Sequence, residues 1–214
     1  LHGNSCTLGD LTPFVSPFST HANCDVLCVT YPGYPGGSKS ASRGRDYDAE
    51  VALSVALAAR ELSSKYSQVF IMGHSLGCSA VLESLRHFSP SGGIILISPF
   101  SSLRSAARHR VGALLSFAVP GNRLNNVAAA RAVMCDVLIL HGNEDDVVPP
   151  RESALLEVAL RQGHGRRVVR HILPHLDHAL SPDTAVGAYT YVNQLWPPHA
   201  SQRPRPSPQL QFRQ

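Results

Sequence analysis

Short, wholly apolar segments alternate with helical patterns along most of this chain, and this alternation constrains the fold more than any other feature. A short apolar run bounded by turn residues is typical of a strand buried on both faces. We therefore predict an α/β domain with a mostly parallel sheet flanked by helices. The predicted strands are 25–30, 69–72, 94–97, 137–140 and 168–173, and the predicted helices are 47–66, 76–88, 152–161 and 183–196.

The chain is long enough for one domain with a substantial core. It has 214 residues, of which 43% are hydrophobic, so a disordered chain and a disulfide-stapled miniprotein are excluded. None of its apolar runs reaches the roughly eighteen residues of a membrane-spanning helix. From residue 197 onward, Pro, Gln, Ser and Arg dominate and cannot build a core. We expect one domain over residues 1–196 and a disordered tail over residues 197–214.

The charge of the chain does not by itself select a partner. The formal net charge is +4, and only Lys39 and Lys65 among the 19 basic residues are lysines. The sequence has no zinc-finger pattern and no basic helix with base-reading chemistry, so we do not expect nucleic acid binding.

The cysteines indicate a reducing compartment. They are odd in number, fall mostly in apolar surroundings and form no CxxC pair, so neither a disulfide framework nor a zinc site is expected. We therefore predict reduced thiols and a cytoplasmic location. The cysteines are Cys6, Cys24, Cys28, Cys78 and Cys135.

The sharpest chemical motif is Gly73-His-Ser-Leu-Gly77, which follows one predicted strand and opens a helix. A serine between strand and helix must take a strained turn, and glycines two positions on either side avoid collisions with it. The Ser75 hydroxyl is then exposed above the sheet, next to a helix amino terminus that favours negative charge. In this strand–turn–helix context the motif predicts a nucleophile.

A serine nucleophile needs a base and an orienting acid, and both types follow later strands. The segment 141–149 (HGNEDDVVP) comes after the strand at 137–140, and the segment 174–178 (PHLDH) comes after the last strand. Active sites of open α/β sheets form at the carboxyl ends of strands. The order serine, acid, histidine is that of α/β-hydrolases.

Taken together, the motifs resemble those of the α/β-hydrolase-fold serine hydrolases, and most closely the branch that includes protein depalmitoylases (acyl-protein thioesterases). The resemblance covers residues 1 to about 196 and implies an α/β-hydrolase fold with Ser75 as nucleophile, Asp145 as acid and His178 as base. The matching strings are LHGN at 1–4, YPGYPGGS at 31–38, GHSLG at 73–77, SPFSSL at 98–103, HGNEDDVVP at 141–149 and DH at 177–178.

Alternatives to the acid and the base remain open in the sequence. Asp146 is the second candidate for the acid, and His175 competes with His178 for the role of base. His171 lies inside the predicted last strand and is expected to pack in the sheet. The chain departs from the family pattern by having Asp177 before His178, where a carboxylate could raise the pKa of the histidine or compete to orient it.

The resemblance also implies an oxyanion hole, which needs two backbone N–H groups. Leu76 follows the nucleophile and should supply one, and Asn4 should supply the other after His2 and Gly3. The alternative is that HGN forms only a turn. His2 and His141 are expected to form local hydrogen bonds beneath the site, and His74 and Cys78 to pack around the serine turn.

The implied chemistry is acyl transfer through an acyl-enzyme, with no metal or organic cofactor. The resemblance implies an acyl ester or thioester substrate, with S-acylated (lipidated) proteins as one class. A lipase, a carboxylesterase or a peptidase of the same fold is the alternative. A non-catalytic scaffold is another, but every residue of the expected triad is present.

A lid is expected over residues 99–131, where this fold carries an insert above the acyl pocket. The stretch has five arginines, no acidic residue and a loose helical apolar stripe, a combination that suits an anionic membrane surface. An ordinary solvated helix is the alternative. The arginines are Arg104, Arg108, Arg110, Arg123 and Arg131, and the stripe comprises Leu103, Ala106, Ala107, Val111, Leu114, Leu115 and Ala118.

The chain begins at Leu1, already inside a motif, so we expect an amino-terminal truncation. The family fold implies about three strands before His2, the third lying between the strands at 25–30 and 69–72. Without it, backbone groups of two central strands lose a neighbour. We therefore expect this chain to be poorly soluble or inactive and a longer parent, with any membrane anchor, to be active.

Overall fold

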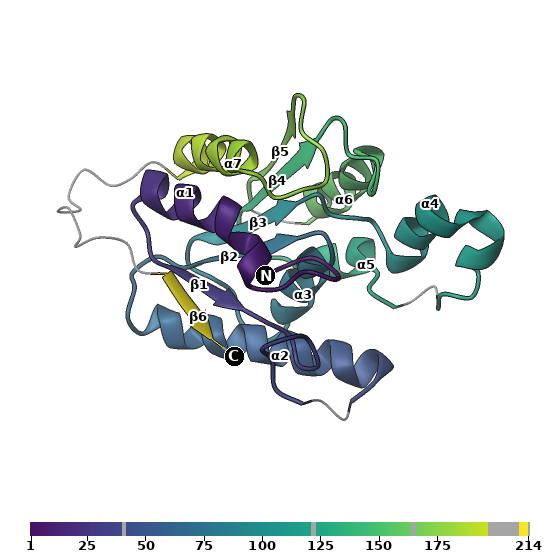
Figure 1. The fold of residues 1–214 in the computed structure, drawn as a ribbon, viewed down its shortest axis with the longest axis horizontal. Coiled ribbons are helices and arrows are strands. Elements are labelled where there is room, and N and C mark those ends of the chain that lie inside the picture. The colour runs from purple at the N-terminus through teal and green to yellow at the C-terminus, as the bar shows by residue number, and fades with distance from the viewer. Residues whose placement is uncertain (40–41, 121–122, 164–165, 197–209, 214) are drawn as a thin grey trace.

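The computed structural model describes residues 1–39, 42–120, 123–163, 166–196 and 210–213. Its strands form two parallel sheets, one of four strands in the order β2-β3-β4-β5 and one of two strands, β1 and β6 (Figure 1). The strands are β1 (Val26–Val29), β2 (Phe70–His74), β3 (Gly93–Ile97), β4 (Val137–Gly142), β5 (Val168–Leu173) and β6 (Leu210–Arg213).

Helices cover both faces of the four-stranded sheet. Helices α1 and α7 pack on one face, and α2, α3, α5 and α6 pack on the other (Figure 1). The short helix η1 (Gly9–Leu11) precedes α1 (Thr12–Ala22). The others are α2 (Gly44–Ser63), α3 (Leu76–Ser84), α4 (Leu103–Ser116), α5 (Asn126–Ala130), α6 (Arg151–Arg161) and α7 (Pro182–Leu195).

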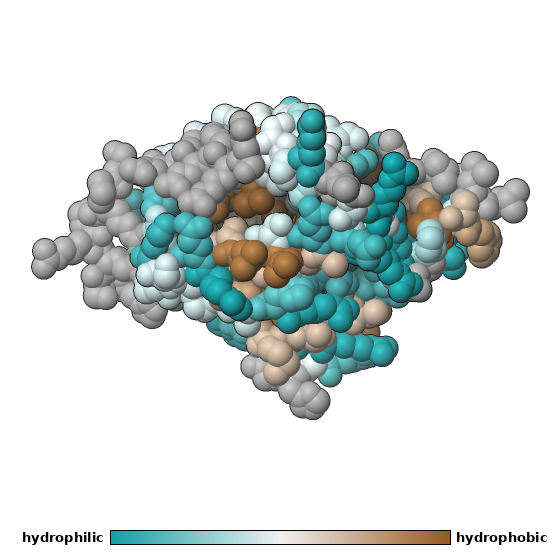
Figure 2. Space-filling model, turned by 90° about the horizontal axis from the view of Figure 1, so that it is seen from below, coloured by the Kyte–Doolittle hydropathy of each residue, from teal (hydrophilic) through white to brown (hydrophobic). Residues whose placement is uncertain are grey.

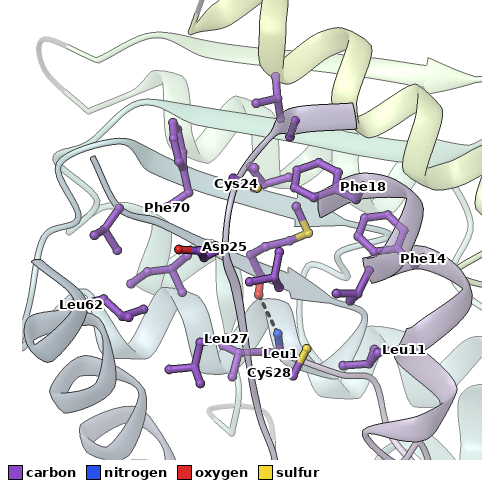
Figure 3. Close-up of a pocket in the computed structure, with 18 of the residues that line it drawn as sticks. Leu1, Leu11, Phe14, Phe18, Cys24, Asp25, Leu27, Cys28, Leu62 and Phe70 are labelled. Carbon is purple, nitrogen blue, oxygen red and sulfur yellow. Dashed lines mark hydrogen bonds between the residues drawn. The ribbon is translucent and has the colours of Figure 1, made fainter. Parts of the chain in front are cut away.

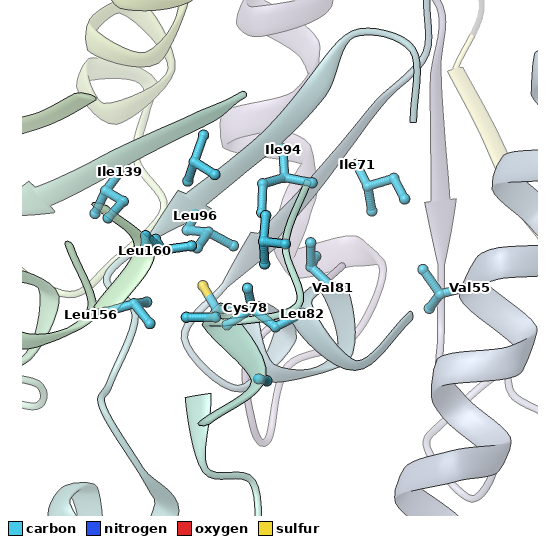
Figure 4. Packing of buried hydrophobic residues seen from close by; sticks show 14 of the residues in the cluster. Val55, Ile71, Cys78, Val81, Leu82, Ile94, Leu96, Ile139, Leu156 and Leu160 are labelled. Carbon is cyan, nitrogen blue, oxygen red and sulfur yellow. The ribbon is translucent and has the colours of Figure 1, made fainter. Parts of the chain in front are cut away.

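The central strand β3 shows why the apolar runs are continuous. All five of its residues are buried. Ile94 and Leu96 join the cluster on the α2, α3, α5 and α6 side (Figure 4), and Ile95 and Ile97 join the cluster on the α1 and α7 side. Successive side chains of a strand point to opposite faces, so a strand covered twice needs apolar residues throughout. Burying one such side chain contributes about 1.5–3 kcal/mol.

The predicted α/β architecture is confirmed. Each predicted strand and helix is present with small shifts at its ends, and β5 has the predicted bounds. Helix α1 was not predicted, because two prolines interrupt its pattern. Pro13 lies in the first turn, where an amide has no helical partner, and Phe14 and Phe18 pack toward the sheet behind the interior Pro17.

The carboxyl-terminal tail differs in part from the expectation of disorder. Residues 210–213 form β6, which pairs in parallel with β1, from Val26 opposite Leu210 to Val29 opposite Arg213. A composition-based prediction misses this strand because a four-residue strand can form by backbone pairing to an existing edge. Residues 197–209 and 214 lie outside the described part of the chain.

In the region expected to form a lid, α4 projects from the body of the molecule, whereas α5 packs against it (Figure 1). Gly112 breaks α4 with a φ of 84° and a ψ of 166°. The side chains of Arg110, Val111, Leu114 and Leu115 lie outside the described part, so the expected apolar stripe is described only around them.

The surface is mixed in character. Figure 2 shows hydrophobic atoms gathered near the middle of the face seen from below, with hydrophilic atoms around them. On α2, Leu53 and Leu57 are each about half exposed, at 46% and 54%. No helix in the described residues has both the length and the hydropathy to cross a membrane.

Candidate active site

Ser75 occupies a sharp turn between β2, which ends at His74, and α3, which begins at Leu76. Its φ of 52° and ψ of −114° lie outside the regions that non-glycine residues favour, and such a conformation costs about 1–3 kcal/mol. The turn is held because Ser75 N donates to the Ile97 carbonyl of β3 at 2.9 Å. The strand–turn–helix context predicted for the motif is therefore present.

The two flanking glycines permit close backbone contacts, although not with the serine, as the sequence had suggested. A Cβ on Gly73 would lie 2.5 Å from the Gly77 carbonyl oxygen. A Cβ on Gly77 would lie 2.6 Å from the Leu1 oxygen and 2.9 Å from the His2 oxygen. Gly77 is therefore needed because the segment at Leu1 and His2 passes directly over α3.

Asp145, which is buried, and His178, which is partly exposed, form a pair beyond the carboxyl ends of β4 and β5. His178 Nδ1 donates to Asp145 Oδ2 at 2.8 Å. The other carboxylate oxygen accepts from Val147 N at 3.1 Å and Val148 N at 2.8 Å. His141 Nε2 lies 3.2 Å from Oδ2 and donates to the Val148 carbonyl at 2.7 Å. The carboxylate is thus held from several sides.

These contacts keep Asp145 ionised. Burial alone raises the pKa of this carboxyl group, but the hydrogen bonds from His141, His178 and Val148 outweigh burial and hold the pKa well below its usual range. A carboxylate at Nδ1 places the proton of neutral His178 on that nitrogen. The lone pair of Nε2 is then available to accept a proton.

The alternative acid and base occupy different surroundings. Asp146 is exposed, whereas the Asp145 side chain has no exposed surface. The His175 side chain is 87% exposed and lies 3.2 Å from Glu144, which is also exposed. His171 stacks on Tyr191 with ring centroids 3.6 Å apart.

Asp177, the departure from the family pattern, is directed to the backbone. Its Oδ1 accepts from Ala179 N at 2.8 Å, which forms a local turn after His178.

His74 connects the serine turn to the loop of His178. Its Nε2 donates to the His178 carbonyl at 2.8 Å, and the two rings lie 4.9 Å apart between centroids. Burial first, and then the neighbouring His178, lower the pKa of His74 to about 4. His74 is therefore neutral at pH 7 and acts as a fixed hydrogen-bond donor. Cys78 is likewise buried, and burial raises the pKa of its thiol to about 12.

The structure brings Asp145 and His178 into direct contact, and it brings Ser75 near them through its neighbour His74. Within the described residues, no hydrogen bond joins Ser75 Oγ to His178 Nε2. Hydrogen bonds of a catalytic site are often longer without substrate and tighten when substrate binds.

The segment 1–4 approaches the serine turn from the other side. A Cβ on Gly3 would lie 3.1 Å from His74 Nδ1 and 3.4 Å from Ser75 Cβ. Asn4 follows directly, and Leu76 opens α3, so both predicted oxyanion donors belong to segments that border Ser75. His2 is buried, with its ring 3.4 Å from Thr30 Oγ1.

Two tyrosines hold this segment, and the sequence alone indicates no role for them. The Tyr31 hydroxyl donates to the His2 carbonyl at 2.7 Å, and the Tyr34 hydroxyl donates to Asn4 Oδ1 at 2.9 Å. Their string, YPGYPGGS, contributed to the family resemblance, but only the fold reveals that both rings reach back to the first residues of the chain.

A buried carboxylate, Glu152, anchors the start of the lid region. It accepts from Ser101 N at 3.0 Å, Ser101 Oγ at 2.5 Å and Ser105 Oγ at 2.7 Å, and it lies 3.3 Å from His109 Nε2. Burial raises the pKa of Glu152, but hydrogen bonds from Ser101 and Ser105 outweigh burial and lower it. The first turns of α4 are therefore tied to α6.

The arginines of the lid region are not equally free. Arg123 pairs with Asp48 at 3.1 Å, and Arg104 Nε donates to the Val119 carbonyl at 2.9 Å while its guanidinium lies over the Phe117 ring. Arg108 and Arg131 are exposed.

Comparison with known families identifies the family of the chain. The sequence model of the Alpha/beta hydrolase family matches residues 1–129, which include the serine turn and the segment above it. The chain belongs to this family.

Two curated relatives illustrate the similarity. Alpha/beta hydrolase domain-containing protein 17B of Homo sapiens is 27% identical over 151 residues, covering 69% of this chain and 49% of its own length. Lysophosphatidylserine lipase ABHD12 of Gallus gallus is 30% identical over 172 residues, covering 70% of this chain and 43% of its own. The chain thus spans less than half the length of these relatives.

Solved structures share the fold. The esterase domain from a Rhodothermus marinus protein superimposes with a TM-score of 0.57 at 19% identity, over 91% of this chain and 81% of that domain. Acylaminoacyl peptidase of Pyrococcus horikoshii, without a bound ligand, gives a TM-score of 0.52 at 17% identity, over 75% and 30% of the two chains.

Proposed function

We propose that the protein is a serine hydrolase that cleaves an acyl ester or thioester through Ser75, His178 and Asp145. The observation that carries the proposal is the hydrogen bond between the buried Asp145 and the partly exposed His178, whose carbonyl is bonded to His74, the residue next to Ser75. A nucleophile, a base and an orienting acid at one edge of the sheet are the parts that acyl transfer requires.

In the proposed reaction, Ser75 Oγ attacks the carbonyl carbon while His178 Nε2 takes the hydroxyl proton. The carbonyl oxygen becomes an oxyanion, which the backbone N–H groups of Asn4 and Leu76 stabilise. His178 then protonates the departing alcohol or thiol, and an acyl-enzyme forms. Water attacks this ester with His178 as base, which releases the acid and restores Ser75. Asp145 stabilises the charged imidazole in both halves.

Labelling with a fluorophosphonate probe tests the nucleophile. A folded chain, either this one or the longer parent expected from the sequence, should be labelled, and Ser75→Ala should abolish labelling, because the probe reacts with an activated serine. Ser16→Ala, which changes an exposed serine of α1, is the matched control and should keep full labelling. A folded chain that takes up no label would favour the non-catalytic scaffold.

For the substrate we propose S-acylated proteins, on the resemblance to the depalmitoylase branch. The named relatives include a lysophosphatidylserine lipase, and the similar folds include an esterase and a peptidase, so esters and peptides are the rivals. Competition of a palmitoyl thioester, a lipid ester and an acylated peptide against the probe would rank the three. Stronger protection by the lipid ester or the peptide would contradict the assignment.

We further propose that the lid region contacts an anionic membrane surface on which lipidated substrates are presented. The exposed Arg108 supports this, since a basic side chain near such a surface contributes about 1 kcal/mol. Replacing Arg104, Arg108 and Arg110 with Glu should weaken sedimentation with phosphatidylserine vesicles and leave neutral vesicles unaffected. Unchanged sedimentation would refute the contact.

A further inference from the structure

The segment 1–4, which carries the proposed oxyanion donor Asn4, is bonded to the sheet at its first residue. The Leu1 amino nitrogen donates to the Met72 carbonyl at 2.9 Å, the bond drawn in Figure 3, and His74 N donates to the Leu1 carbonyl at 3.1 Å. Leu1 also lines a cavity of about 510 Å³ that lies along β1 and β2. The bonds at Leu1 therefore orient the start of the segment, but Asn4 lies beyond them.

The backbone at Asn4 takes a turn that needs support from other parts of the chain. Residues 4 and 5 form this turn, and both are exposed. Ser5 has a φ of 59°, in the left-handed region that non-glycine residues rarely adopt. Such a conformation persists only where the surrounding contacts hold it. The position of the Asn4 N–H therefore depends on the side chains that anchor the turn.

Residues that directly follow β1 supply these anchors. Thr30 Oγ1 lies 3.4 Å from His2 Nε2, and the Tyr31 hydroxyl donates to the His2 carbonyl at 2.7 Å. The Tyr34 hydroxyl donates to Asn4 Oδ1 at 2.9 Å, so among these contacts it is the one that reaches Asn4 itself. Burial raises the pKa of the Tyr34 hydroxyl, which therefore stays protonated at neutral pH and remains a donor.

Tyr34 is itself held in place by packing and by backbone bonds. Its ring lies 5.1 Å from the His2 ring and 5.4 Å from the Tyr31 ring between centroids, and the second contact is edge-on. Tyr34 N donates to the Tyr31 carbonyl at 3.1 Å, and Gly37 N donates to the Tyr34 carbonyl at 2.9 Å. A Cβ on Gly37 would collide with the Tyr31 carbonyl oxygen, so the loop can be this tight only with glycine there.

The turn that Tyr34 anchors lies next to the proposed nucleophile. A Cβ on Gly3 would lie 3.4 Å from Ser75 Cβ, so the backbone just before Asn4 passes directly beside Ser75. An oxyanion donor acts only within about 2.7–3.1 Å of the charged oxygen. A misplacement of about 1 Å can cost about 10²-fold in rate. A residue that fixes Asn4 can therefore control the rate without touching the substrate.

We propose that Tyr34 is a positioning residue of the oxyanion hole. Its hydroxyl holds the Asn4 side chain and thereby keeps the Asn4 backbone N–H directed at the oxyanion that forms when Ser75 attacks. This inference rests on the proposed function, because the oxyanion exists only if Ser75 is the nucleophile. The charge is present in the transition state and absent from the bound substrate, so Tyr34 affects kcat and not KM.

The test is the hydrolysis of a p-nitrophenyl ester by the folded chain or its longer parent. Tyr34→Phe removes the hydroxyl and keeps the ring, and it should lower kcat by about ten- to a hundredfold with KM unchanged. Tyr66→Phe, which removes a hydroxyl bonded to Asp25 at 2.6 Å, is the matched control and should keep the parental kcat. An unchanged kcat in Tyr34→Phe, or a loss that appears only in KM, would overturn the proposal.

Inhibition by a trifluoromethyl ketone measures the oxyanion hole more directly. Ser75 Oγ bonds to the ketone carbon, His178 takes the hydroxyl proton, and the ketone oxygen becomes an oxyanion. The inhibition constant should therefore rise in Tyr34→Phe by the same factor by which kcat falls. An unchanged inhibition constant would show that the lost rate has another cause, and would overturn the proposal.

A double-mutant cycle shows whether Tyr34 acts through Asn4. Asn4→Ala removes the side-chain acceptor and keeps the backbone N–H. If the hydroxyl acts only by holding this side chain, Tyr34→Phe should lower kcat in the parent and cause no further loss in Asn4→Ala. A full further loss in the double variant would show that Tyr34 acts on the substrate directly, and would overturn the positioning role.

Failure of this inference and failure of the proposed function give different results. A folded protein that hydrolyses no ester, or one whose hydrolysis survives Ser75→Ala, would refute the proposed function and the inference with it. Hydrolysis that requires Ser75 but is unaffected by Tyr34→Phe would refute the inference alone.

Discussion

The β4–β5 corner of the sheet and the β1–β2 junction flank the same serine turn but differ in how completely their backbones are bonded. At the corner, β4 and β5 pair over six residues. Beyond β4, Asn143 N donates to the carbonyl of Leu173 at the end of β5, and Glu144 N donates to the carbonyl of Leu176 in the following loop, both at 3.0 Å. At the junction, residues of β1 and β2 line a cavity, and Leu1 is bonded to the β2 side of it. Asp145 and His178 therefore lie on the side where neighbouring strands are paired. The segment that leads to Asn4 lies on the side where β1 and β2 are not paired with each other.

The largest expected effect tests the β4–β5 side, where the strands are paired. Asp145→Asn should lower kcat by about 10⁴-fold, because an amide at this position no longer fixes the His178 tautomer or stabilises its charge. Hydrolysis of a p-nitrophenyl ester measures kcat. The variant and the parent are compared at equal protein concentration, and circular dichroism checks that both have the same fold. Asp146→Asn is the matched control, and since Asp146 is exposed its kcat should stay close to that of the parent.

A pair of core truncations compares the two sides directly. Leu138→Ala in β4 removes a fully buried side chain and should lower the free energy of unfolding by about 2–5 kcal/mol. Leu27→Ala in β1 should cost only about 1 kcal/mol, because that side chain already borders a cavity and is half-buried. Urea denaturation provides both values. Equal costs would show that β1 is packed as tightly as β4.

The last expected effect concerns acid stability at His74, which lies between the two sides and matters only at low pH. Its pKa in the folded chain is lowered to about 4, from 6.5 in the unfolded chain. Between these values the unfolded state binds more protons, so stability falls as the pH falls from 6.5 and the loss is complete below about 4. The contribution is at most about 3 kcal/mol.

His74→Gln removes the titrating group and can keep the hydrogen bond to the His178 carbonyl. The unfolding free energy of this variant should depend less steeply on pH between about 4 and 6.5 than that of the parent, measured by urea denaturation at several pH values. His87→Gln, at an exposed histidine, is the control and should keep the parental slope. The same slope in His74→Gln would contradict the assignment of the buried neutral ring.

Much of the fold and the location of the candidate site could be predicted from the sequence, because both depend on local patterns. Buried strands such as β3 need apolar residues on both faces, and the Gly73–Gly77 motif indicates a sharp turn between a strand and a helix. The preference for Asp145 over Asp146 came from the family resemblance. The structure adds a physical reason, since Asp145 alone of the two is buried and bonded to His178.

What could not be predicted depends on contacts between distant segments. The role of Gly77 requires knowing that Leu1 crosses α3, and the hydrogen bonds of Tyr31 and Tyr34 require knowing that the loop after β1 returns to the first residues. Composition likewise gives no sign that residues 210–213 pair with β1, because the energy of that strand comes from the edge it meets.

The anchoring of α4 by Glu152 has a consequence for how large molecules would reach the sheet. Four contacts hold Ser101, Ser105 and His109 to one carboxylate, whereas Gly112 interrupts the helix beyond them. The first part of α4 is therefore held to α6 by one buried side chain, and Gly112 separates it from the rest of the helix. A large molecule that reached the sheet past this projection would therefore meet a boundary that is fixed where α4 begins.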